Sequence, residues 1–221
     1  MPFFDDGRNM AGRTARCLGL GLVVISEVFS PMIRAQQQSA AIEAARLNNL
    51  GTALVGQQFL DRAVSTFAAA ATADPSLILA KVNEGIALMY LQKLPDAERL
   101  FDAAAVDDPK DPHVWYALGL LYRNENRPEK ALEAFQKVAA LRPGDPDTHY
   151  MIASVDFELN NLAAAKAEYQ KALDLDPHHA SALFGLARVL RREGDTAGAQ
   201  QALARFQHIS SAKLGTPLSH N

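Results

Sequence analysis

Hydrophobic positions between residues 115 and 143 follow the period of an α-helix. Trp115, Leu118 and Tyr122 are three and four residues apart, which places them on one face of a helix. A polar turn follows at residues 124–128, and after it comes a second apolar stripe of Ala131, Phe135 and Val138. The stretch therefore predicts two amphipathic helices joined by a tight turn, the second closed by Pro143.

The same pattern returns with a fixed period along the chain. The closing prolines stand 34 residues apart, at Pro75, Pro109, Pro143 and Pro177. Two apolar series keep this phase, a small one at Ala63, Ala97, Ala131, Ala165 and Ala199 and a large one at Phe67, Phe101, Phe135, Tyr169 and Leu203. Because proline disfavours the α conformation in the residue before it, helices should end at Asp74, Asp108, Arg142 and Asp176. A helical hairpin repeated in this way predicts a solenoid.

These residues resemble the tetratricopeptide repeat family. The family pattern of Trp, Leu-Gly, Tyr, Ala, Phe, Ala and Pro is matched by the unit from Trp115 to Pro143, except at Val138. Other units keep the phase over residues 40–210, with departures at Lys81, Glu84 and Ser211. The resemblance implies an all-α, right-handed α-solenoid of about five helix-turn-helix hairpins. We expect a repeat domain over 36–211, with repeats near 44–77, 78–111, 112–145, 146–179 and 180–211, and a flexible tail over 212–221.

Two sets of equivalent positions predict local geometry. Between the two helices of each unit lie Gln58, Gln92, Asn126, Asn160 and Gly194, and Asn and Gly tolerate the left-handed conformation that closes a helix. Inside the first helices lie Gly51, Gly85 and Gly119, where glycine costs about 1 kcal/mol relative to alanine, so a packing reason is expected. We expect the alanine series to cross there, and Ala131→Leu to overpack that crossing by about 1 to 3 kcal/mol.

Residues 1–35 do not fit the repeat. Arg8, Arg13 and Arg16 precede the apolar run CLGLGLVVI, and the polar QQQS stretch follows Ala35, an order typical of a secretory signal. We expect a signal peptide or an N-terminal membrane segment here, although Glu27 disfavours an uncleaved span. An irregular or helical extension is the remaining alternative.

These features set the expected boundary of the repeats and the expected location of the protein. The first repeat helix should begin near residues 36–39. The protein should be exported, periplasmic or membrane-anchored facing the periplasm of a bacterium, and a cytoplasmic location is the alternative.

Composition and motifs disfavour several functions. The net charge of −3 and pI near 6.1 provide no basic field for nucleic acid. The lone Cys17 can form neither an internal disulfide nor a Cys-rich zinc site. No G-x-S-x-G, P-loop or H-E-x-x-H motif occurs, and the adjacent His178 and His179 have no third ligand at helical spacing. We therefore expect no catalytic residue, no metal and no cofactor, and the chain is not expected to be an enzyme.

In this family the first helix of each hairpin lines the concave side of the solenoid. Carrying those positions over gives a candidate groove of Asn48, Asn83, Tyr90, Tyr116, Asn124, Tyr150, Phe157, Phe184, Arg188, Arg191 and Arg192. Its rings offer apolar area to an extended peptide or partner helix, and its Asn side chains can pair with a peptide backbone. Packing of the repeat itself also favours Tyr and Asn at some of these positions.

The charged positions of the candidate groove bear on the kind of partner. The family's clamp for a C-terminal carboxylate is disfavoured, because Asn83 alone matches it. Arg188, Arg191 and Arg192 suggest instead that an acidic segment is read, with a solvated last helix as the alternative.

The sequence therefore favours a protein-interaction scaffold that binds a peptide segment or a partner protein. Membrane contact is expected only through the N-terminal segment. One alternative is a structural spacer or assembly module whose activity lies in a domain after Asn221. Another is an enzyme or small-ligand binder, which would need a deep pocket.

Overall fold

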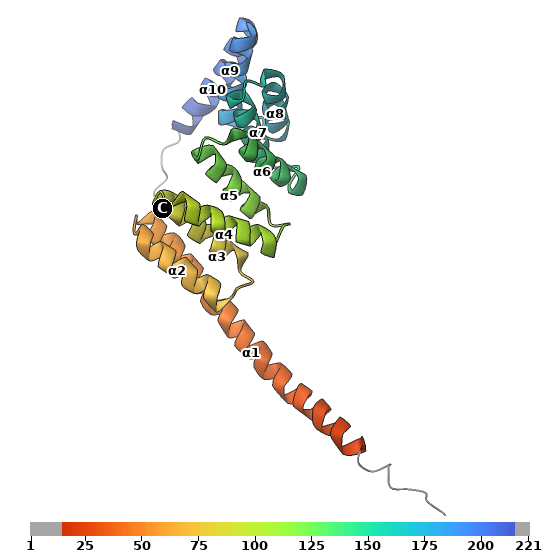
Figure 1. Ribbon diagram of the computed structural model, residues 1–221. Coiled ribbons are helices and arrows are strands. Elements are labelled where there is room, and N and C mark those ends of the chain that lie inside the picture. The colour runs from red at the N-terminus through yellow and green to blue at the C-terminus, as the bar shows by residue number, and fades with distance from the viewer. Residues whose placement is uncertain (1–14, 215–221) are drawn as a thin grey trace, which may run out of the picture.

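The computed structural model describes the backbone of residues 15–214 and the side chains of residues 31–211. Ten α-helices and no strands occupy the described backbone (Figure 1). They are α1 (Ala15–Gly56), α2 (Leu60–Ala73), α3 (Ile78–Tyr90), α4 (Leu94–Asp107), α5 (Pro112–Asn124), α6 (Pro128–Leu141), α7 (Pro146–Glu158), α8 (Leu162–Leu175), α9 (Ala180–Glu193) and α10 (Thr196–Leu214).

The helices pair into consecutive hairpins, α1 with α2, α3 with α4, and so on to α9 with α10. Each helix packs mainly against the helices before and after it in the chain, with weaker contacts between neighbouring first helices such as α3 and α5. The first helices of the later hairpins start at Ile78, Pro112, Pro146 and Ala180, each 34 residues after the last. The fold is a right-handed α-solenoid, whose core lies between adjacent helices rather than at one centre.

The turns inside the hairpins confirm the predicted left-handed positions. Gln58, Gln92, Asn126, Asn160 and Gly194 have φ of 64°, 60°, 56°, 63° and 85°. The N–H of the following residue then returns to the preceding helix, as where Arg127 donates to the carbonyl of Tyr122 at 2.8 Å. The two glutamines adopt this conformation at some steric cost, so closure of the hairpin outweighs local preference.

The ends of the second helices also confirm the sequence. The C-cap residues of α2, α4, α6 and α8 are Asp74, Asp108, Arg142 and Asp176. Each of the three aspartates accepts a hydrogen bond from the backbone N–H two residues later, at 2.9 to 3.0 Å. The side chain thus supplies a turn that proline alone would leave open.

The packing at the helical glycines differs from the expectation. The nearest side chain to Gly51, Gly85 and Gly119 is the ring of Phe67, Phe101 and Phe135, respectively. A Cβ placed on Gly119 would lie 2.5 Å from Cε1 of Phe135, too close for any real contact. The glycine therefore makes room for an aromatic ring, not for an alanine crossing. Ala131 is nevertheless fully buried, so overpacking by Ala131→Leu stays a prediction.

The fourth hairpin uses a variant of this contact. Its large position is Tyr169, and Ala153 takes the place of the glycine in its own first helix. The Tyr169 ring instead lies against Gly185 of α9, where a Cβ would overlap it. The side chain is only 2% exposed, and this burial raises the pKa of its phenol to about 12.

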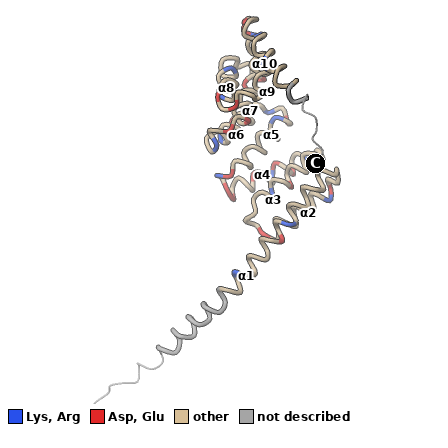
Figure 2. The backbone as a smooth tube through the Cα atoms, turned by 180° about the vertical axis from the view of Figure 1, so that it is seen from behind, with Lys and Arg blue, Asp and Glu red and all other residues tan. Residues whose placement is uncertain are grey.

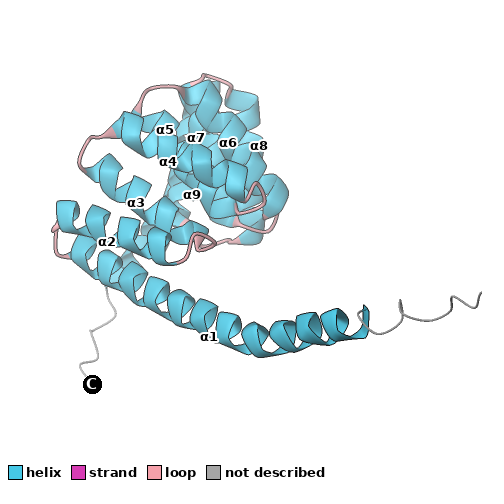
Figure 3. Cartoon of the chain, turned by 60° about the horizontal axis from the view of Figure 1, so that its bottom comes forward, coloured by secondary structure: helices cyan, strands magenta, loops and turns pink. Residues whose placement is uncertain are grey.

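The first helix begins earlier than predicted. α1 starts at Ala15 rather than near residues 36–39, and runs as a long arm away from the stacked hairpins (Figure 3). The polar stretch at residues 36–39 does not end a helix, because Gln and Ala are good helix formers and no Gly or Pro lies between residues 32 and 50. Pro31 lies inside the helix. In the described part of the chain, no helix combines the length and apolar character needed to cross a membrane.

Both predicted terminal segments lie partly outside the described residues. The signal-like stretch includes residues 1–14, which are not described, and its cleavage stays a prediction. At the other end α10 continues to Leu214, past the expected start of the tail at residue 212. With 19 residues it is longer than the 14-residue second helices before it.

The ring-to-glycine contact predicts the effect of a small substitution. Gly119→Ala should lower the free energy of unfolding by about 1 to 3 kcal/mol, although alanine favours helix by about 1 kcal/mol, because the new Cβ overlaps the Phe135 ring. Gly56→Ala is the matched control, since nothing lies within 4 Å of its Cβ. Chemical denaturation measures both. Stabilisation by both variants would contradict the packing described here.

The buried phenol predicts how stability falls at alkaline pH. An unfolded tyrosine titrates at about pH 10, whereas Tyr169 holds its proton until about pH 12. Its contribution to the free energy of unfolding should be intact below pH 10 and decline by up to about 3 kcal/mol as the pH rises through the folded pKa. Tyr169→Phe should remove this decline, and Tyr90→Phe, at an exposed site, should keep it. A pH-independent difference between wild type and Tyr169→Phe would refute the assignment.

Candidate partner-binding groove

The candidate groove is formed by side chains from α1, α3, α5, α7 and α9. Its most exposed rings are Tyr90, at the end of α3, and Phe184, on α9, which are 62% and 46% exposed. Phe184 packs against Phe206 of α10 with ring centroids 5.6 Å apart. Asn124 is exposed at the last position of α5. These side chains are available to a partner in the free protein.

At the N-terminal end of the candidate groove two asparagines join the first hairpins to each other. Asn83 Nδ2 donates to Asn48 Oδ1 at 2.8 Å, and Asn48 is only 8% exposed. The Thr52 hydroxyl donates to the Asn48 carbonyl at 3.1 Å. The Asn48 side chain is therefore committed to contacts within the protein, and this end offers less free hydrogen-bonding capacity than its composition suggests.

The middle of the candidate groove is aromatic. Tyr116 on α5 meets Phe135 edge to face at 5.6 Å. Tyr150 on α7 lies between Tyr169 and His179, with ring centroids 6.1 and 5.2 Å away. Both tyrosines are half-buried, so each has one face in the core and leaves part of the ring to solvent.

A small hollow opens beside Tyr116. It measures about 270 Å³ and lies between the starts of α5 and α7, lined by Pro112, His113, Tyr116, Val138, Arg142, Asp145 and Asp147. Burial, followed by the charges of Asp147 and Asp145, raises the pKa of the Tyr116 phenol. The hydroxyl therefore stays protonated and able to donate at neutral pH.

The C-terminal end of the candidate groove carries an aromatic ring covered by two guanidinium groups. The centre of the Phe157 ring lies 4.3 Å from Cζ of Arg188 and 5.0 Å from Cζ of Arg192. Arg192 also donates to Asn160 Oδ1 at 3.2 Å. Arg191, between them in sequence, is exposed and makes no hydrogen bond, ion pair or ring contact among the described side chains. The structure thus brings together two of the three predicted arginines.

The other arginine of this surface is already paired. Arg123 on α5 forms an ion pair with Glu158 on α7 and lies 3.4 Å from the Ser154 hydroxyl. Its charge is therefore balanced inside the protein. Over the whole solenoid, Lys and Arg are interspersed with Asp and Glu (Figure 2), as expected for a chain of low net charge.

Acidic residues gather at the opposite ends of the same helices. Asp111 caps α5 by accepting from the N–H of His113 at 2.8 Å. Asp147 accepts from Nε2 of His179 at 3.0 Å, while Nδ1 of that histidine accepts from the N–H of Ala182. His179 is thus a helix cap in one tautomer rather than a free ligand. Among the described residues no three His, Cys, Asp or Glu side chains are arranged to hold a metal ion.

A different face of α5 borders a second hollow, of about 510 Å³, between α4 and α6. Its lining consists of Asp102, Ala105, Val106, Trp115, Leu118, Tyr122, Lys130, Glu133, Ala134 and Lys137. The Trp115 indole N–H donates to the carbonyl of Pro109 at 2.9 Å, and Lys137 Nζ lies 3.6 Å from the centre of its ring. Both Lys130 and Arg127 lie over Tyr122 in the same way.

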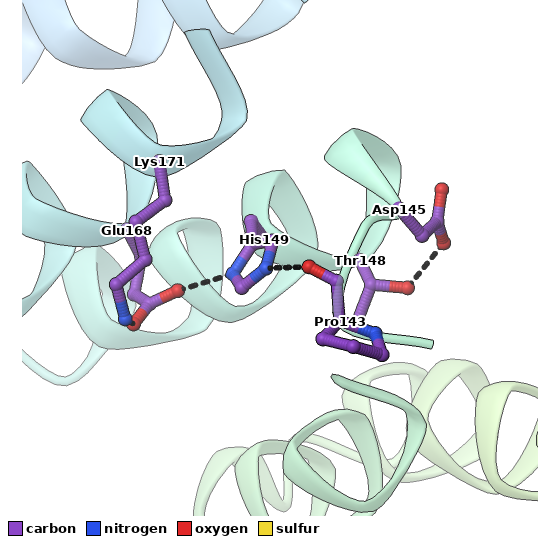
Figure 4. Close-up of polar contacts among 6 residues, drawn as sticks. All are labelled: Pro143, Asp145, Thr148, His149, Glu168 and Lys171. Atoms are coloured by element: carbon purple, nitrogen blue, oxygen red, sulfur yellow. Dashed lines mark hydrogen bonds and ion pairs between the residues drawn. The ribbon is translucent and has the colours of Figure 1, made fainter. Parts of the chain in front are cut away.

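The next hairpin fills the equivalent place with a polar network (Figure 4). His149 stands where the previous repeat has Trp115, and its Nε2 lies 3.1 Å from the carbonyl of Pro143. Its Nδ1 lies 2.7 Å from Glu168, which also accepts from Lys171 at 2.6 Å. Burial would raise the pKa of Glu168, but the hydrogen bonds from Lys171 and His149 outweigh it and lower that pKa. The hollow at Trp115 exists because Ala134 replaces this glutamate.

Sequence reasoning missed two contributors to the candidate groove. Tyr169 belongs to a second helix, but its ring reaches the first-helix column at Gly185. The signal was present in the sequence, since a glycine in that column coincides with Ala153 in place of the repeat glycine. Glu158 was missed because only its position one hairpin along from Arg123 makes it a partner.

Comparison with known proteins agrees with this geometry. Residues 82–146 and 150–212, and separately 122–171, match the Tetratricopeptide repeat family. A curated relative, putative cellulose synthase operon protein C of Escherichia coli O157:H7, is 33% identical over 93 residues, 41% of this chain and 8% of that protein. The chain spans less than a tenth of the length of the first curated relatives it matches.

Solved structures show the same architecture at low identity. PilF of Pseudomonas aeruginosa is similar with a TM-score of 0.71 and 19% identity, over 78% of this chain and 77% of that one. YrrB, described as a TPR protein with an unusual peptide-binding site, gives a TM-score of 0.61 and 19% identity, over 80% and 91%. Such identities establish the fold alone. From its repeats, its hairpin stacking and these matches, the chain belongs to the tetratricopeptide repeat family.

Proposed function

We propose that this protein is an interaction scaffold that binds an extended segment of a partner protein in the candidate groove. The observation that carries the proposal is the row of partly exposed aromatic rings on successive first helices, from Tyr90 through Tyr116 and Tyr150 to Phe184. Aromatic side chains supply large apolar contact area at low entropic cost and are enriched at the energetic centres of interfaces. That YrrB is described as binding a peptide supports the same use of the fold.

An extended partner fits the candidate groove better than a small ligand. Small-molecule pockets usually enclose about 300 to 1,000 Å³ and bury most of their ligand. The hollow at Tyr116 measures about 270 Å³ and receives side chains from two neighbouring repeats only. A row of shallow subsites at regular spacing suits successive side chains of one segment, so we propose a non-catalytic role.

The aromatic row predicts which substitutions weaken binding. Tyr90→Ala should lower partner capture several-fold without loss of stability, because the ring is exposed. Tyr116→Ala with Tyr150→Ala should lower it further, at a stability cost read from thermal unfolding. Gln136→Ala, on an exposed face of α6, is the matched control. Capture of partners from a native envelope fraction, quantified by mass spectrometry, is the measurement.

Two results would count against the proposal. Partners that bind all these variants equally do not use the candidate groove. A chain that captures nothing reproducibly, while a longer natural chain containing it is active, would favour the structural spacer.

We also propose that residues 1–35 direct export. Three arginines before an apolar run support this. Residues 1–40 fused to a phosphatase that is active only outside the reducing cytoplasm should give active enzyme in a bacterial host. Replacing Leu20 and Val23 by Asp, which interrupts the apolar run, should abolish that activity. An inactive wild-type fusion would favour the cytoplasmic alternative.

A further inference from the structure

We propose that Arg188 and Arg192, held in place by Phe157, form a receptor for the carboxylate of an Asp or Glu side chain in the bound segment. The inference rests on the proposed function, because it names the chemistry of the segment that the candidate groove selects. It also narrows the sequence hypothesis from three arginines to two.

The first argument is preorganisation. Immobilising a long side chain at an interface costs about 0.5 to 1.5 kcal/mol, and an arginine that is already ordered avoids most of this cost. Both guanidinium groups lie on the Phe157 ring, at 4.3 and 5.0 Å from its centre, and Arg192 is also anchored on Asn160. The ring therefore holds two fork-shaped donors close together before a partner arrives.

The second argument is the absence of an internal counterion. Among residues 31–211, no carboxylate lies within ion-pair distance of Arg188 or Arg192. Other arginines of the solenoid are balanced, as Arg127 is by Glu98 at 3.0 Å and by Glu125 at 2.6 Å. The acid next to Arg192 in sequence, Glu193, is paired with Lys166 at 2.7 Å. Two ordered cations on one ring without a carboxylate are an unfilled anion site.

The third argument is the distribution of charge across the candidate groove. The N-terminal ends of α5 and α7 carry Asp111, Asp145 and Asp147, whereas the arginine pair lies toward the C-terminal end of α9. A carboxylate is repelled at the first edge and attracted at the second. An acidic side chain would therefore fix both the position and the direction of the segment.

The exposed arm of α1 does not supply this group. Over residues 31–43 it contains one acid, Glu43, which is paired with Arg46 at 2.7 Å. The arm of a second copy therefore lacks the free carboxylate that the site requires. The charge match points to a different protein with an acidic segment.

Peptide selection on the full-length protein tests the inference. A phage-displayed library of random peptides, with the displayed segment internal so that it has no free C-terminus, is selected in parallel on wild type, on Arg188→Ala/Arg192→Ala and on Phe157→Leu. Wild type should enrich peptides with Asp or Glu at one fixed position. A selected peptide should bind about tenfold more weakly when that acid becomes Asn or Gln, and about tenfold more weakly to the double variant.

Phe157→Leu separates preorganisation from charge. It keeps every charge and a side chain of similar burial, yet removes the ring, so it should weaken the acidic peptide and leave its Asn twin unaffected. Arg191→Ala is the matched control, because it removes the same charge from the same helix turn without touching Phe157, and it should retain most of the affinity. Thermal unfolding confirms that each variant is folded.

The possible failures are distinguishable. Peptides that are enriched without acids, or that bind the double variant as well as wild type, would overturn this inference and leave the proposed function intact. Equal losses in Arg191→Ala and Arg188→Ala would replace the two-arginine site by a diffuse positive field. A selection that enriches nothing on any variant would overturn both proposals.

Discussion

The structure depends on one contact repeated between the two helices of a hairpin, an aromatic ring set against a glycine. Phe67, Phe101 and Phe135 each fill the space that a Cβ would occupy in the facing first helix. The glycine costs helix stability, and the ring buries a large apolar surface that offsets this cost. Because the contact recurs every 34 residues, it also sets the distance from one hairpin to the next.

This spacing separates what the fold requires from what the function uses. Buried positions of each repeat are nearly fixed in kind, with alanine at one site and an aromatic ring at another. Exposed positions of the first helices vary freely, from Tyr90 to Asn124 to Arg192. A regular frame with a variable surface is the physical basis for recognition by this fold. The fourth hairpin shows the two coupled, since moving the ring of Tyr169 onto Gly185 changes the floor of the candidate groove.

Much of the architecture could be predicted from the sequence because its determinants are local. The phase of the prolines predicts where the second helices end, and Asn126 and Asn160 mark turns by their own conformational tolerance. Three features could not be predicted in this way. The partner of Gly119 depends on which side chain crosses it in space, the arm of α1 depends on the lack of any stop signal, and the stacking of Arg188 and Arg192 on Phe157 depends on the register between α7 and α9.

The central claim is that stacked hairpins leave their first helices, and not their second helices, as the partner-binding surface. Hydrogen–deuterium exchange of the protein with and without a captured partner tests it directly. Slower exchange in α5, α7 and α9 with unchanged exchange in α4, α6 and α8 is the predicted result. Protection concentrated in α4 and α6, around the hollow at Trp115, would contradict the account.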